Sequence, residues 1–87
     1  MARFEAVVEI THLPGVADPA GATVQRALPA LGWSNVSELK IAKTIRLLVE
    51  SGTSAEAEAQ VREMCERILA NPVIENYVVR VSELAGA

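Results

Sequence analysis

Several residue types that point to a particular class of protein are scarce in this chain. Aromatic residues make up only 3% of it, and it has one cysteine, Cys65, and one histidine, His12. A single cysteine cannot form an internal disulfide, so the chain does not fit a small disulfide-stabilised secreted domain. A single histidine leaves no histidine pair, and no His–Cys set of ordinary ligand spacing, for a metal site within one chain.

The chain also lacks an excess of positive charge and a long apolar run. Its net charge is −3, with a pI near 5.1, so it offers no basic field for nucleic acid or anionic lipid. No segment approaches membrane-spanning length, and the N-terminal residues lack a signal-peptide apolar region. We therefore expect a cytoplasmic protein that binds neither nucleic acid nor membrane.

What the chain does contain is typical of a globular fold. Apolar residues make up 51% of the 87 residues, mostly as alanine, valine, leucine and isoleucine. This length predicts a single domain over residues 1–87. A domain this small leaves much of its surface exposed, so a further interface is a plausible source of stability.

The first half predicts a strand followed by a helix. Residues 4–11 alternate between an apolar face and a more polar one, which is the period of a strand. Asp18 and Pro19 predict a helix start, since a carboxylate caps free amides and proline fits the first helical position. Apolar residues then recur at helical spacing as far as Leu31, and Gly32 is a suitable stop. Pro29 predicts a kink or an early end of this helix.

Residues 36–50 are strand-like, but the alternation changes phase at Ala42-Lys43. Two short strands joined by a tight turn are the preferred interpretation, and one long, bulged strand is the alternative.

The second helix is better specified. Thr53 and Glu56 have the spacing of a capping box, and Asn71-Pro72 ends the helical pattern. The predicted apolar stripe consists of Ala57, Val61, Met64, Cys65, Ile68 and Leu69. Residues 73–81 then predict a last strand, followed by a short tail.

This order of elements predicts a ferredoxin-like α+β fold. The succession is βαββαβ, with both helices on one face of an antiparallel sheet. On the opposite face, Val7 and Leu48, with some of Val78, Val79 and Val81, must lie among charged residues. A face this apolar predicts cover by a second copy of the chain or by another protein.

The residues that could carry chemistry have ordinary explanations. Cys65 lies on the apolar stripe, which favours a buried structural thiol. The scattered glycines form no phosphate-binding loop. Asp18 is interpreted as a helix cap that could also face a partner, and Lys43 as a turn charge that could make an interfacial contact. We therefore predict no catalytic, cofactor-binding or metal-binding residues in this chain.

Three segments nonetheless resemble one family closely. Val16-Ala17-Asp18-Pro19-Ala20-Gly21, followed by Val24-Gln25-Arg26-Ala27-Leu28, is similar to its "V-L-D-P-x-G … A-L" opening. Lys40-Ile41-Ala42-Lys43-Thr44-Ile45, with Leu47 and Glu50, resembles its central "R-x-G-K-x-(apolar)-x-L-x-(apolar)-E". Residues 64–77, MCERILANPVIENY, resemble its "M-C-x-x-L-L-A-N-P-V-I-E-x-Y" nearly throughout. The family is PurS, the small subunit of phosphoribosylformylglycinamidine synthase.

The resemblance implies a role in purine biosynthesis. In this reaction formylglycinamide ribonucleotide, glutamine and ATP give formylglycinamidine ribonucleotide, glutamate, ADP and phosphate. It implies a non-catalytic subunit of this carbon–nitrogen ligase, acting as a homodimer or homotetramer. That subunit would bridge the glutaminase PurQ and the synthetase PurL and assist ammonia transfer, while ATP and magnesium bind to PurL.

The chain departs from the family pattern at three places. Ala42 replaces a glycine, Leu13-Pro14 stands where many members have a lysine, and Pro29 lies inside the first helix. The alternative function is a ferredoxin-like regulatory module that binds a small amino acid at a dimer interface. A glycine-rich loop after the first strand would favour it, but Leu13-Pro14-Gly15-Val16 supplies one glycine.

Overall fold

Strand β1, Ala2–His12, is the centre of the structure, which is a computed structural model that describes residues 1–84. It pairs antiparallel with β2, Lys43–Ser51, on one side and with β3, Glu75–Glu83, on the other. The strand order is therefore β2-β1-β3. Alternate side chains of β1 are fully buried, which confirms the predicted strand and its inward face: Phe4, Ala6, Val8 and Ile10.

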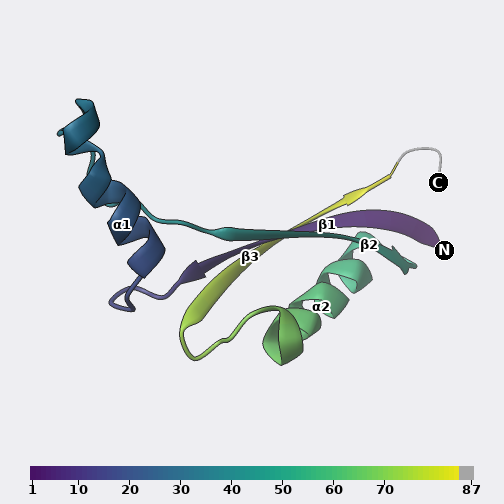
Figure 1. The fold of residues 1–87 in the computed structure, drawn as a ribbon. Helices are drawn as coiled ribbons and strands as arrows, with labels where there is room; N and C mark the ends of the chain where they lie inside the picture. The colour runs from purple at the N-terminus through teal and green to yellow at the C-terminus, as the bar shows by residue number, and fades with distance from the viewer. Residues whose placement is uncertain (85–87) are drawn as a thin grey trace.

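Helix α2, Ser54–Met64, covers the inward face of the sheet (Figure 1). Thr53 caps it as predicted, because its hydroxyl accepts a hydrogen bond from the Glu56 N–H at 3.2 Å. The Glu56 carboxylate does not complete the box on Thr53. It accepts instead from the Gly52 N–H and the Ser51 hydroxyl, each at 3.3 Å. Ala57, Val61 and Cys65 are buried against the strands and complete the core.

The end of this helix corrects one residue of the predicted stripe. Cys65–Leu69 form a π-helical turn, η2, in which the Ala70 N–H donates to the Cys65 carbonyl. The wider turn inserts one residue into the helical phase. As a result Ile68 is 80% exposed, and the prediction that it belongs to the core is wrong. Leu69 instead packs against the core.

Helix α1, Pro19–Ala27, begins and ends where the sequence indicates. Asp18 is its N-cap and Pro19 its first residue. Pro29 ends the α-helix early, as predicted, and opens a short 3-10 helix, η1, Pro29–Leu31. Gly32 then adopts a φ of 104°, a conformation that side chains with a Cβ rarely take.

The segment before β2 corrects the predicted strand order. Residues 33–42 contain no regular element, and the chain enters β2 at Lys43 without turning back. The preferred pair of strands at 36–50 is wrong, and so is the placement of Lys43 in a turn. Neither Ala42 nor Lys43 has the positive φ that a two-residue hairpin turn requires. The order is βαβαβ with three strands, while the α+β class with an antiparallel sheet is confirmed.

The two helices do not share one face of the sheet. Within residues 1–84, α1 packs against η1 and has no extensive contact with a strand or with α2. Figure 1 shows α1 beyond the end of the sheet, whereas α2 lies against it. The prediction of two helices on one face is therefore wrong for a single copy of the chain.

The corner after α2 is tight. Asn71 accepts from the amides of Val73, Ile74 and Glu75, and its own N–H donates to the Glu75 carboxylate at 2.7 Å. These bonds occupy residues 71–74, so β3 starts two residues later than predicted and includes Ser82 and Glu83, which were predicted to belong to the tail. The rest of that tail, residues 85–87, lies outside the described residues.

Candidate functional site

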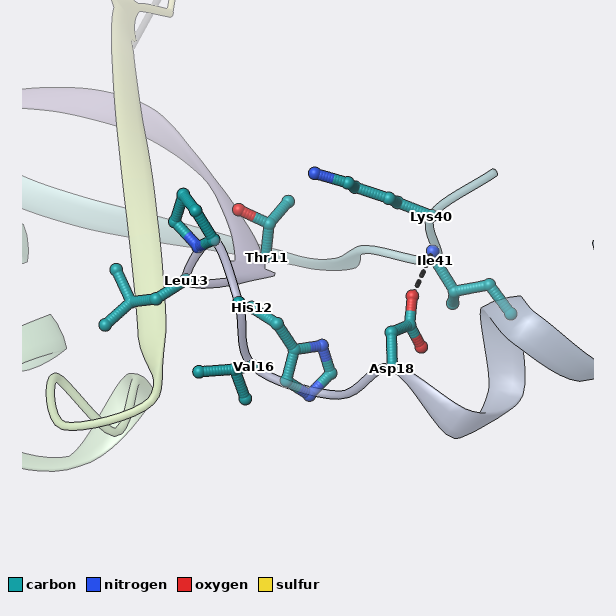
Figure 2. Close-up of a pocket in the computed structure, with 9 residues that line it drawn as sticks. Thr11, His12, Leu13, Val16, Asp18, Lys40 and Ile41 are labelled. Carbon is teal, nitrogen blue, oxygen red and sulfur yellow. Dashed lines mark hydrogen bonds between the residues drawn. The ribbon is translucent and has the colours of Figure 1, made fainter. Parts of the chain in front are cut away.

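Polar side chains gather where β1 ends and α1 begins. A cavity of about 100 Å³ lies at this junction, between the loop after β1 and the extended segment before β2 (Figure 2). Its polar lining comes from Thr11 and His12 of β1, Asp18 at the start of α1, and Lys40. Asp18 was singled out from the sequence, whereas Thr11 and Lys40 were not expected to lie beside it.

Asp18 uses both carboxylate oxygens to hold backbone together. Oδ1 accepts from the Gly21 N–H at 3.0 Å. Oδ2 accepts from the Ile41 N–H, also at 3.0 Å (Figure 2). The bond to Gly21 is the predicted cap. The bond to Ile41, 23 residues away, was not predictable from local spacing. Asp18 therefore fastens the start of α1 to the chain that returns to the sheet.

A second bond makes a similar connection about two helical turns later. The side-chain oxygen of Gln25 accepts from the Leu39 N–H at 2.9 Å. Gly21 lies between the two, and a Cβ there would collide with the Asp18 carboxylate and lie 3.1 Å from the Leu39 carbonyl oxygen. Glycine at this position lets the returning segment approach the helix closely.

The electrostatics of the junction favour a structural role for Asp18. The hydrogen bonds from Ile41 and Gly21 lower the pKa of its carboxyl, with smaller contributions from the charges of His12 and Lys40. A carboxylate whose two oxygens already accept backbone bonds is not placed to act as a general base. Within residues 1–84, no group of three or more His, Cys, Asp and Glu side chains is arranged to hold a metal ion.

Cys65 is buried in the core, as predicted for a structural thiol. Burial raises the pKa of its thiol, and the nearby Glu66 adds to this effect. A raised pKa leaves the thiol protonated and poorly nucleophilic at neutral pH.

The outward face of the sheet is the second candidate. We call it the open face: it carries the apolar side chains of Val7, Leu48 and Val78 among an equal number of arginines and glutamates. Leu48 is 55% and Val78 51% exposed. Across the strands Arg46 pairs with Glu5 at 3.4 Å, beside a shallow hollow of about 330 Å³. The charged residues of this face are Arg3, Glu5, Glu9, Arg46, Glu50 and Arg80.

These positions match the predicted open face closely. Val7 and Leu48 lie on it as predicted, and Val78 is the member of the valine group that joins them, while Val79 and Val81 face inward. Lys43 is the first residue of β2, is exposed, and lies outside the junction cavity. The sequence therefore located one surface well, and missed how Asp18, Gln25 and residues 39–41 come together.

Comparison with known proteins gives a consistent result. The family model PurS, described as phosphoribosylformylglycinamidine (FGAM) synthase, matches residues 5–83. The PurS subunit of Synechocystis sp. is 44% identical over 80 residues, which cover 92% of this chain and 80% of that protein.

None of the helices within residues 1–84 is long and apolar enough to cross a membrane.

Solved structures agree. The crystal structure of PurS from Methanocaldococcus jannaschii, a subunit of formylglycinamide ribonucleotide amidotransferase, has a TM-score of 0.84 and 38% identity, covering 93% of this chain and 98% of that one. A chain in the structure of PurLQS from Thermotoga maritima also has a TM-score of 0.84, with 36% identity, covering 97% of this chain and 100% of that one.

Proposed function

The chain belongs to the PurS family, and we propose that it is the small, non-catalytic subunit of a phosphoribosylformylglycinamidine synthase complex in purine biosynthesis. The observation that carries this proposal is the family match over residues 5–83, which includes most of β1, both helices, β2 and β3. The relatives cited are themselves of similar length, so the match involves whole subunits.

The proposed partners are the synthetase PurL and the glutaminase PurQ. A chain of the Thermotoga maritima PurLQS structure covers 97% of this chain, which supports the same assembly here. ATP and magnesium would bind to PurL, and this chain would bind no cofactor. We also propose that the chain associates with itself, as a homodimer or homotetramer.

A bridging subunit would help to transfer ammonia between the two active sites of the complex. Ammonia released from glutamine would be diluted and largely protonated in bulk water. Holding two active sites around a closed path keeps the ammonia concentrated and unprotonated until it reacts. The open face, with its exposed Leu48 and Val78, offers a surface through which a bridging subunit can contact a partner.

The same proposal includes a chain without catalytic, cofactor-binding or metal-binding residues, folded as one domain and acting in the cytoplasm. The double use of the Asp18 carboxylate and the buried Cys65 thiol support it, since neither group is free for chemistry. The regulatory-module alternative has no glycine-rich ligand loop to support it.

Reconstitution tests this function directly. PurL and PurQ from the same organism are assayed with and without the chain, with either glutamine or ammonium chloride as nitrogen donor, and ADP release is measured. We expect glutamine-driven turnover to require the chain and ammonia-driven turnover to be independent of it. If the chain changes neither rate, the proposed function is wrong for this protein.

A further inference from the structure

The apolar side chains of the open face form one diagonal stripe across the sheet. Helix α2 covers the other face, and within residues 1–84 no helix lies over this one (Figure 1). In the strand register Leu48 of β2 lies opposite Glu5 of β1, and Val78 of β3 lies opposite Glu9. Val7 lies midway between these two glutamates on β1. The stripe Leu48–Val7–Val78 is therefore about 17 Å long, for strands about 4.8 Å apart that rise about 3.4 Å per residue.

Charged side chains line both sides of this stripe. Arg46 and Glu9 lie on one side, and Glu5 and Arg80 lie on the other. Each side therefore carries one positive and one negative charge. Arg46 reaches Glu5 across the stripe at 3.4 Å, but 67% of its side chain is exposed. An exposed ion pair of this kind adds little to stability, so a partner can displace it.

A hollow beside the stripe offers a place for an anchoring side chain. It has a volume of about 330 Å³ and is lined by Glu5, Arg46, Leu47 and Leu48. Leu48 is 55% exposed beside this hollow. One large apolar side chain of a partner can enter the hollow and cover Leu48, as an interface anchor does.

The width of the stripe distinguishes between kinds of partner. A second sheet packed face to face would also cover the charged residues on both sides, and taking charges out of water is costly unless each finds a well-placed partner. A single α-helix is about 10 Å across, so it covers a stripe one side chain wide and leaves the flanking charges at a wet rim. Three helical turns measure about 16 Å, which matches the length of the stripe.

We propose that the open face binds one amphipathic helix of a partner subunit, laid along the stripe from Leu48 to Val78. This inference rests on the proposed function and names the kind of element through which PurL or PurQ contacts the chain. The helix presents apolar side chains at positions i, i+4, i+7 and i+11, the spacing of one helical face. An acidic residue on the flank that faces Arg80, and a basic residue on the flank that faces Glu9, complete the match.

Photo-crosslinking in the assembled complex tests this proposal. The chain is made with p-benzoylphenylalanine at position 48 or at position 78, mixed with PurL and PurQ and irradiated, and the cross-linked peptides are identified by mass spectrometry. We expect both positions to reach one helix of one subunit, at sites about 11 residues apart, because a helix rises about 1.5 Å per residue. Cross-links to a second copy of the chain, cross-links to segments that share no helix, or the absence of cross-links would overturn the proposal.

A matched pair of substitutions on β3 gives an independent readout. Val78→Glu places a charge under the bound helix, whereas Ser82→Glu adds the same charge on the same strand and face but outside the stripe. Both positions are exposed, so both variants should fold, which thermal unfolding checks. We expect the Kd for the PurL and PurQ subunits to rise roughly tenfold or more in Val78→Glu and to stay within about twofold in Ser82→Glu. Equal losses in the two variants would indicate cover over the whole face, and unchanged binding in both would indicate an uncovered stripe. Either result contradicts a single docked helix.

The failure of this inference can be distinguished from the failure of the proposed function. If glutamine-driven turnover requires the chain while the stripe cross-links to no helix of PurL or PurQ, the inference is wrong and the function stands. If the chain neither binds these subunits nor changes turnover, the proposed function is wrong, and the inference is wrong with it.

Discussion

Asp18 is the residue on which the position of α1 most directly depends. Its two oxygens bind one amide in the helix and one in the segment that returns to the sheet. Capping explains its position in the sequence, because a carboxylate before Pro19 is a common helix start. The bond to Ile41 gives it a second role, which is to hold together the two ends of the arm, residues 13–42, which comprise the loop after β1, α1, η1 and the segment before β2.

Replacing Asp18 tests this double role. In Asp18→Ala both backbone amides lose their acceptor, so we expect faster hydrogen exchange at Gly21 and Ile41. In Asp18→Asn one oxygen becomes an NH2 group, which cannot accept, so one of the two bonds survives. Exchange at individual amides, followed by NMR, is the measurement. Glu38→Gln is the control, because it removes an exposed charge on the same segment and keeps the length of the side chain at a position whose φ is 56°, so it should leave both amides unchanged.

The same bonds predict how acid affects the arm. The pKa of Asp18 is lowered from its ordinary value of 3.8 in the folded chain. The stabilisation is therefore fully present above pH 4 and is lost as the pH falls through the lowered folded-state pKa. We expect protection of the Ile41 amide to fall in that range in the wild-type chain, and not in Asp18→Ala. Equal acid sensitivity in the two chains would show that other carboxylates control the arm.

At the scale of elements, α2 and its π-turn show where helical periodicity is a reliable guide and where it fails. Ala57, Val61 and Cys65 are buried as their spacing predicts, because the α-helix is regular up to Met64. The wider turn at Cys65–Leu69 then changes the phase, and no residue type in this stretch announces it. Ile68, which the regular spacing placed in the core, faces outward as a result.

A pair of substitutions tests this change of phase. Val61→Asp places an unpaired charge in the core, and we expect a loss of stability of about 3 kcal/mol or more. Ile68→Asp lies on an exposed turn, and we expect an effect within about 0.5 kcal/mol. Thermal unfolding of both variants is the measurement. Equal losses in the two variants would restore Ile68 to the core.

A strand was predictable where its partners lie in the same chain. The alternation in β1 specifies its buried face, because Phe4, Val8 and Ile10 can only be covered by α2 and its neighbours. Residues 36–41 also have a strand pattern, but they find no partner strand within their own chain. The local sequence of residues 36–41 favours an extended backbone. Their pairing with β2 of the same chain would require a turn at Ala42, which the backbone does not make.

The site was less predictable than the fold. The cap at Asp18 follows from two adjacent residues, whereas its bond to Ile41 joins positions 23 residues apart. The bond from Leu39 to Gln25 is similarly remote, at a separation of 14 residues. Contacts of this kind depend on how the arm returns to the sheet, and single-sequence periodicity contains no information on that path.

For the whole molecule, the two faces of the sheet have different tasks. The inward face carries the core under α2, although Ile45 and Leu47 of β2 are only half-buried there. The open face has no helix in the described part of the chain, and its alternating arginines and glutamates balance one another. A neutral face with exposed Leu48 and Val78 is suited to a partner that covers it without a large electrostatic cost.

Leu48 gives the sharpest test of that second surface. Its side chain is 55% exposed at the centre of the open face, so Leu48→Glu should leave the fold of the isolated chain intact. In the reconstituted complex the added charge would be buried without a counter-charge, and we expect glutamine-driven turnover to fall at least tenfold, which corresponds to about 1.4 kcal/mol. Val73→Glu is the matched control, since Val73 is 79% exposed in the corner before β3 and lies off this face. The variant is assayed at the lowest concentration at which the wild-type chain gives full turnover. Full activity of Leu48→Glu at that concentration would show that the open face stays uncovered in the complex. In that case the partner would have to bind at the edges of the sheet and not at the open face.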